Sequence, residues 1–147
     1  IWRMKIAAWA ANRTAFTDRR DDPAGDGSGR DPASAKLQEK FRAAKEASWI
    51  ANRIVELKKE HPTWTPATLK GQAAKDWKKQ AALHPLDQVA GGGATPTAMG
   101  NKRVNSSIGS TWKNEVGKVE KGIKGIKKKD QKKWNMNVLI RMDGAPV

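Results

Sequence analysis

The sequence predicts a mainly α fold: a small helical core with extended linkers, a basic amphipathic C-terminal helix and one terminal β-strand. Apolar residues recur at helical spacing along much of the chain. Two stretches rich in glycine, proline and small polar residues, 19–34 and 87–111, separate these patterns. Because only 37% of the 147 residues are hydrophobic, any single core is modest.

Residues 1–18 are predicted to form an N-terminal helix. Trp2, Ile6, Trp9 and Ala10 recur at three- and four-residue spacing and would face one way. The linker 19–34 follows this helix.

A helical unit is predicted over residues 35–86. Its long first helix begins near Ala33 to Lys36 and ends at about Glu60. Pro62 disfavours helical geometry at the preceding residue, and Thr65 followed by Pro66 is typical of a helix start. A second helix therefore begins there. The predicted core of the helix pair is Trp49, Ile50, Ile54, Leu57, Leu69, Ala73 and Trp77.

Residues of about 43–85 resemble the HMG box, and in particular its plant relative, the YABBY domain. The resemblance rests on Trp49-Ile50, the apolar residues four and seven positions after that isoleucine, Pro62, and the Ala-Ala-Lys-Asp-Trp run over 73–77. It implies a packed helix pair. Residues 43–46 read Ala-Ala-Lys-Glu, which departs from the Pro-Ser-Ala-Tyr-like residues that face the minor groove in DNA-bending members. The long third helix and the YABBY zinc finger are also missing.

Residues 112–133 are predicted to be a basic amphipathic segment. Trp112, Val116, Val119, Ile123 and Ile126 recur at spacings of four and three. Three glycines in this stretch each cost about 1 kcal/mol of helix propensity, so we expect the helix to order only against a surface. That surface would be nucleic acid, protein or anionic lipid, and the alternative is a loosely ordered linker. The predicted polyanion-binding residues are Lys118, Lys121, Lys124, Lys127, Lys128, Lys129, Lys132 and Lys133.

Residues 134–147 are predicted to contain a strand. Trp134, Met136, Val138, Ile140 and Met142 alternate on one face, which is strand periodicity. Without a second convincing strand in the sequence, this pattern favours addition to the edge of a partner's sheet, or a strand supplied to a neighbouring subunit. The alternative is a buried extended tail.

Seven tryptophans and no tyrosine make an unusual aromatic composition. Trp9, Trp49 and Trp77 fit the apolar faces of helices. Trp64, between two threonines in the turn, is predicted to be an exposed anchor or stacking platform, with capping of the helix pair as the alternative. The predicted partner-docking residues are Trp64, Trp112, Trp134, Met136, Val138 and Ile140.

The net charge of +14 is concentrated in the C-terminal third. Residues 102–133 contain eleven lysines and arginines against three acidic residues. Such a stretch attracts a polyanion without sequence preference, and the alternative is a solvated, partly disordered tail. No apolar run is long enough to span a membrane. The first acidic residue is Asp18, which is compatible with an organelle-directed segment.

We expect no catalytic site. Both histidines, His61 and His84, precede prolines, and we expect neither to have a partner at metal-ligand spacing. The triple glycine at 91–93 lacks the lysine and Ser/Thr of a phosphate-binding loop. With no cysteine, disulfides and thiolate metal sites are excluded. The prediction is therefore a protein that is not an enzyme and has no metal or cofactor.

Two functions follow from these observations. The first is a structural subunit of a large assembly, such as a virion capsid, an organellar ribosome or a respiratory complex, that docks on other protein subunits. The second is an architectural, HMG-box-like protein that binds DNA or RNA through its basic tail with little sequence specificity. Both place the chain inside a cell, an organelle or a virion.

Overall fold

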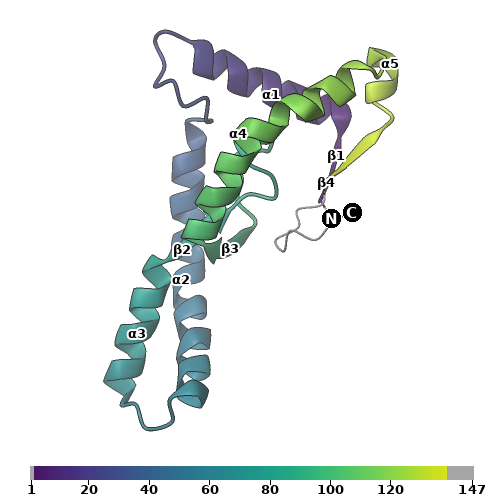
Figure 1. Cartoon of the computed structure of the whole chain (residues 1–147). Coiled ribbons are helices and arrows are strands. Elements are labelled where there is room, and N and C mark those ends of the chain that lie inside the picture. The colour runs from purple at the N-terminus through teal and green to yellow at the C-terminus, as the bar shows by residue number, and fades with distance from the viewer. Residues whose placement is uncertain (1, 139–147) are drawn as a thin grey trace. The chain divides into compact units, whose positions relative to one another are not determined.

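The computed structural model describes residues 2–138 and has the mainly α fold that the sequence predicts (Figure 1). In chain order the elements are β1 (Trp2–Lys5), α1 (Ile6–Asp21), α2 (Ala33–Glu60), α3 (Pro66–Lys78), β2 (Gln80–Leu83), the 3-10 helix η1 (Gln88–Ala90), β3 (Ala98–Asn101), α4 (Lys102–Lys124), α5 (Lys128–Gln131) and β4 (Asn135–Val138).

The chain divides into two compact units. The terminal unit comprises Ile1–Asp31, Pro85–Gly93 and Ser110–Val147, and the central unit comprises Pro32–His84 and Ala94–Gly109. Helix α4 therefore begins in the central unit and ends in the terminal unit. In the part of the chain that the structure describes, no helix has the length and apolar character needed to cross a membrane.

In the central unit, α2 and α3 form an antiparallel helix pair (Figure 1). The turn between them ends where the sequence predicts, because the Thr65 side chain accepts a hydrogen bond from the Thr68 amide at 3.2 Å and Pro66 takes the first helical position. Leu57, Leu69 and Ala73 are buried between the helices. The half-buried residues packed on them are Ile50, Ile54 and Trp64.

The two tryptophans of the predicted helix-pair core also meet. The rings of Trp49 and Trp77 lie 5.5 Å apart at 48°, a tilted arrangement that aromatic pairs favour. Trp77 is buried and Trp49 is half-buried. The Arg42 guanidinium lies 4.8 Å from the Trp77 ring centre, on its face. The sequence pattern therefore describes the packing of this pair correctly.

The central unit also contains a two-stranded antiparallel sheet, in which Gln80 pairs with Asn101 and Leu83 with Ala98. The sequence predicts a linker over 87–111, but the structure has η1, β3 and the start of α4 within that range. Short strands of alanine, methionine and glycine have no periodicity to detect. At Gly100 an added Cβ would overlap the Leu83 side chain, so the lack of a side chain permits this close approach.

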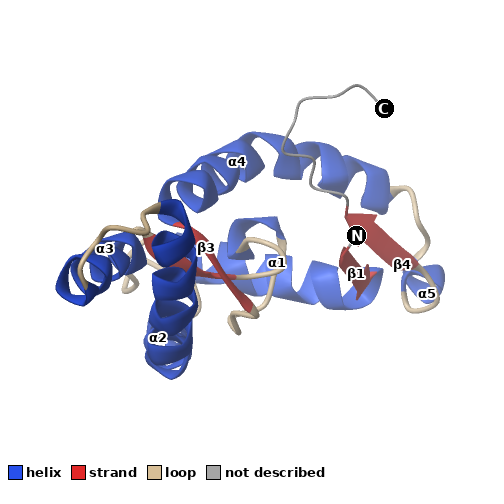
Figure 2. Cartoon of the chain, turned by 90° about the horizontal axis from the view of Figure 1, so that it is seen from below, coloured by secondary structure: helices blue, strands red, loops and turns tan. Residues whose placement is uncertain are grey.

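In the terminal unit, β1 and β4 pair antiparallel, with Trp2 opposite Val138 and Lys5 opposite Asn135 (Figure 2). The predicted N-terminal helix therefore begins later, at Ile6. The prediction that β4 adds to a partner's sheet is also wrong, because β4 pairs with a strand of its own chain. Residues 2–5 satisfy a helical pattern in sequence, and their pairing with residues 130 to 136 positions away decides the conformation.

The core of the terminal unit forms around Trp9. Its buried residues are Trp9, Leu86, Ala90 and Val116. The residues that pack around them are Met4, Ala10, Trp112, Val119, Ile123 and Met136. The Trp9 indole N–H donates to the Ala90 carbonyl, so this buried ring has its polar atom satisfied.

Helix α4 begins at Lys102, ten residues before the predicted start at Trp112. It includes Gly117 and Gly122 despite their poor helix propensity. Val116 is buried in the terminal core and three more apolar residues of α4 pack there, so burial of the apolar stripe offsets the cost of the glycines. The expectation that this stripe orders only against an external surface is therefore wrong.

Candidate functional site

The predicted polyanion-binding lysines lie on the last turns of α4, on α5 and in the segments around them. All eight side chains are exposed. Lys118, Lys121 and Lys124 follow one another at three-residue spacing, so they lie along one side of α4. The apolar side of the same helix faces the terminal core. The eight exposed lysines give the end of α4 and the residues that follow it a basic surface, called here the lysine face.

Few acidic groups neutralise the lysine face. Lys118 lies 2.7 Å from Glu115, and Lys133 lies 3.8 Å from Asp130. Within residues 2–138 the other six lysines of the face form no ion pair: Lys121, Lys124, Lys127, Lys128, Lys129 and Lys132. Exposed ion pairs contribute little in water, so this surface keeps most of its positive charge.

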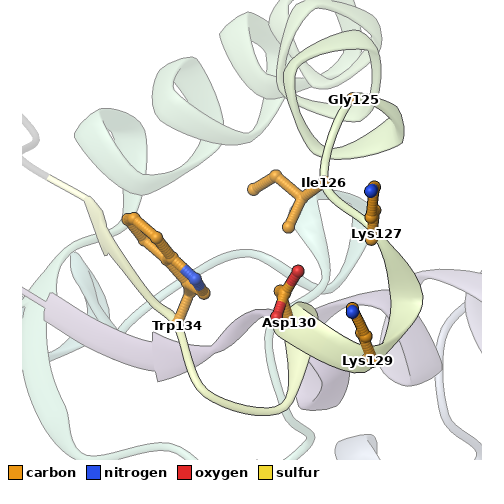
Figure 3. Close-up of a pocket in the computed structure, with 6 residues that line it drawn as sticks. All are labelled: Gly125, Ile126, Lys127, Lys129, Asp130 and Trp134. Atoms are coloured by element: carbon orange, nitrogen blue, oxygen red, sulfur yellow. The ribbon is translucent and has the colours of Figure 1, made fainter.

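A pocket of about 380 Å³ opens on the lysine face. It is lined by Gly125, Ile126, Lys127, Lys129, Asp130 and Trp134 (Figure 3). In Figure 3 the Trp134 ring lies on one side and the two lysines on the other, with Ile126 and Asp130 between them. The pocket thus places an aromatic face, an aliphatic side chain, one carboxylate and two ammonium groups around one space.

The local backbone explains how these groups come together. Helix α4 ends at Lys124, and the chain then reverses through Gly125 and the single turn of α5. The Lys127 carbonyl accepts from the Asp130 amide at 2.8 Å, and the Trp134 amide donates to the Asp130 carbonyl at 3.1 Å. The Gln131 side chain donates to the Ile126 carbonyl at 3.0 Å. These bonds return the chain so that Trp134 faces Ile126.

The Trp134 side chain is 61% exposed, although its backbone is held in place. Its carbonyl accepts a hydrogen bond from the Ile6 amide at 3.2 Å, and β4 begins at the next residue. An exposed indole on a fixed backbone is a ready surface for stacking. The sequence predicts Trp134 as a docking residue but gives no sign of the pocket beside it.

The other predicted docking residues have different environments. Trp64 stacks on His61 with ring centres 3.9 Å apart at 8°, and it packs on the helix-pair core, so it caps the pair. Trp112 and Met136 pack against the core of the terminal unit. The side chain of Val138 and all of Ile140 and Met142 lie outside the described residues.

A charged cluster that sequence reasoning missed joins α2 to α3. Arg53 lies 3.0 Å from Glu56, 3.0 Å from Glu60 and 3.2 Å from Asp76. Asp76 also accepts from Lys79 at 2.9 Å. The Lys79 and Arg53 hydrogen bonds lower the pKa of Asp76, and the carboxylates raise the pKa of Arg53. Because every charge here has a partner within the helix pair, we interpret the cluster as structural.

His84 directly follows β2, and the sequence predicts no role for it. Its Nε2 lies 2.9 Å from the Ala94 carbonyl, which can only accept, so Nε2 is the donor in this hydrogen bond. Asp87 follows three residues later in the sequence. Its Oδ1 accepts from the Val89 amide at 3.0 Å at the start of η1. Among the described residues, no three His, Cys, Asp or Glu side chains are placed to hold a metal ion together.

The fold and the lysine face define a small, basic, helical domain with a cluster of exposed lysines near its C-terminal end. Residues 3–142 match the family model Ntox15, described as novel toxin 15. The chain therefore belongs to the Ntox15 family. No curated protein matches it.

This membership corrects the resemblance to the HMG box and the YABBY domain. The toxin family covers almost the whole chain, whereas the resemblance covers one helix pair. The residues that carry the resemblance form the buried contact of α2 with α3, and such packing patterns recur between unrelated families. The predicted roles as a subunit of a capsid, ribosome or respiratory complex, and as an architectural HMG-box-like protein, are also wrong.

Proposed function

We propose that this chain is a toxin domain whose target is nucleic acid, which it binds through the lysine face. Membership of a toxin family supports the first part of the proposal. The lysine face carries the second part, because eight exposed lysines lie between residues 118 and 133 and six of them have no acidic partner in the described chain. Nucleic acid is the cellular polyanion that such a surface attracts most strongly by releasing counterions.

The chemistry of the lysine face indicates how the target is bound. Lysine ammonium groups are point charges that contact phosphates, whereas sequence-specific contacts need groups placed against base edges. All eight basic residues of the face are lysines. The proposal is therefore binding with little sequence preference, which suits a toxin that must act on any nucleic acid it meets.

The test combines binding with toxicity. The purified chain is titrated with duplex DNA, single-stranded DNA and RNA over a salt series, and the gene is expressed from an inducible promoter in bacteria. The variant replaces Lys127, Lys128 and Lys129 by Ala. The matched control replaces Lys40, Lys70 and Lys78, three exposed lysines of α2 and α3, by Ala. It removes the same amount of positive charge as the variant does.

We expect the wild-type chain and the control to bind nucleic acid and to arrest growth. The variant should lose much of its affinity for nucleic acid and much of its toxicity. The proposal is overturned if the wild-type chain binds no nucleic acid at low salt. It is also overturned if the variant arrests growth as strongly as the wild-type chain while it folds normally, because toxicity would then not need the lysine face.

The prediction that the chain is not an enzyme stays open. One observation favours a second candidate function, hydrolysis of the bound nucleic acid. His84 is held in place through the hydrogen bond from Nε2 to the Ala94 carbonyl, and histidine is the commonest general base in enzymes. A carboxylate, Asp87, follows three residues later in the sequence.

A cleavage assay decides between the two candidates. Supercoiled plasmid and RNA are incubated with the chain, with and without Mg²⁺, and compared with the His84→Gln variant, whose side chain can still donate to the Ala94 carbonyl. A toxin that acts by binding alone leaves all substrates intact. A hydrolase cuts at least one of them, and His84→Gln stops the cutting without weakening binding.

A further inference from the structure

The pocket beside Trp134 has features that phosphate binding alone does not explain. We propose that it binds an unpaired nucleotide of a nucleic-acid strand, with the base stacked on the Trp134 ring and the adjoining phosphate at Lys127 and Lys129. This inference rests on the proposed function and deepens it, because it names single-stranded nucleic acid as the preferred form of the target.

The size of the pocket and the exposure of its ring support this assignment. A volume of about 380 Å³ is at the lower end of the range for small-molecule sites and can hold a nucleotide. Trp134 is 61% exposed, and leaving so much indole surface in water has no structural benefit. Base–aromatic stacking is the usual way in which proteins hold unpaired bases.

The distribution of charge in the pocket separates the place of the base from the place of the phosphate. Asp130 lies in the middle of the lining, between Trp134 and the two lysines (Figure 3). Its carboxylate would repel a phosphate placed at the centre, whereas a neutral base can lie there and donate a hydrogen bond to it. The phosphate is then left to Lys127 and Lys129 at the rim. A free phosphate ion or a polyphosphate would fit this arrangement poorly.

The rigidity of the platform also favours stacking. The Trp134 amide donates to Asp130 and its carbonyl accepts from Ile6, so both backbone groups beside the ring are fixed. Ile126, half-buried between the ring and the two lysines (Figure 3), provides an apolar contact for a base edge. A ring on a fixed backbone loses less conformational entropy on binding than one on a mobile segment would.

A preference for single strands follows from this geometry. In a duplex the faces of the bases are stacked on one another, so a tryptophan can reach them only at ends, gaps or mismatches. Duplex DNA can still bind to the lysine face through its phosphates. The pocket therefore adds affinity for single strands on top of a general attraction for both forms.

The experiment compares Trp134→Leu with Trp134→Phe in the full chain. The probes are short fluorescent oligo(dT) and oligo(rU) and a duplex DNA of the same length, at one fixed salt concentration. We expect Trp134→Leu to weaken the binding of a single strand by about fivefold or more, which corresponds to the lower end of the range for the loss of one stacked base. The affinity of this variant for the duplex should stay within about twofold of the wild-type value. Trp134→Phe, which keeps an aromatic ring, retains most of the single-strand affinity.

A pair of lysine variants tests the place of the phosphate. Lys127→Ala with Lys129→Ala should weaken single-strand binding more than Lys40→Ala with Lys70→Ala, which removes the same charge elsewhere. Circular dichroism and thermal melting confirm that each variant is folded. Oligo(dT) and oligo(rU) show whether the pocket accepts DNA, RNA or both.

The outcomes separate this inference from the proposed function. If Trp134→Leu binds single strands as the wild-type chain does, while salt-dependent binding to nucleic acid persists, the nucleotide pocket is refuted and the proposed function stands. Equal weakening of single-strand and duplex binding refutes it too. If the wild-type chain binds none of the probes, the proposed function fails and the inference fails with it.

Discussion

The salt dependence of binding gives the most quantitative prediction. Lys127, Lys128 and Lys129 are exposed and have no acidic partner in the described chain. For duplex DNA, each phosphate that a protein neutralises contributes about 0.9 to the slope of log K against log salt. If all three lysines contact phosphates, their replacement by Ala lowers the magnitude of that slope by up to about 2.7, so binding depends less steeply on salt.

The assay is fluorescence anisotropy of a labelled duplex, titrated with the wild-type chain and the triple variant from low to moderate salt. Lys127 is the cap residue of α5 but its side chain makes no capping bond, so its truncation leaves the turn intact. The control with Lys40, Lys70 and Lys78 replaced has the same net charge. The reasoning is refuted if the slope is unchanged in the variant, or if the control lowers the slope as much.

Three further predictions concern stability. Leu57 is 2% exposed between α2 and α3, so its replacement by Ala should lower the free energy of unfolding by about 2–5 kcal/mol. A decrease of under about 1 kcal/mol, measured by urea unfolding, would contradict the packing described. Gly91 has a φ of 86°, and an added Cβ would lie 2.7 Å from the Trp9 indole. Gly91→Ala should therefore cost about 1–3 kcal/mol in backbone strain alone, and unchanged thermal stability would count against this geometry. The pKa of Asp76 is lower in the folded chain than its ordinary value of about 3.9 in the unfolded chain. The ionised carboxylate therefore stabilises the fold at pH values above the ordinary pKa, and this stability is lost as the pH falls through the pKa of the folded chain. Asp76→Asn should weaken stability at neutral pH by about 1–3 kcal/mol and flatten its acid dependence, which unfolding measured between pH 2 and 7 would show.

The sequence predicts the helix pair well because its signals are local. Thr65 and Pro66 start α3 through contacts within one turn, and Leu57, Leu69 and Ala73 recur at helical spacing. The β1–β4 pair could not be predicted in the same way. Its two strands are four residues long and lie at opposite ends of the described chain, so neither carries a local sign of its partner.

The candidate site was predicted only in part. The lysines stand out by composition, and Trp134 stands out as an apolar residue at the end of a basic segment. The pocket depends on the chain reversal that brings Trp134 back to Ile126, and that reversal is held by backbone bonds to residues of ordinary type. The resemblance to the HMG box misled for a related reason, because buried contacts such as Trp49 with Trp77 report how helices pack and not what a surface binds.

Ultraviolet crosslinking in intoxicated bacteria would test the central claim most directly. The chain is expressed to the point of growth arrest, irradiated and purified under denaturing conditions, and the attached nucleic acid is labelled and identified. The account predicts crosslinked nucleic acid that falls sharply when Lys127, Lys128 and Lys129 are replaced by Ala and not in the Lys40, Lys70 and Lys78 control. Growth arrest without any crosslinked nucleic acid would show that this toxin domain acts on a different target.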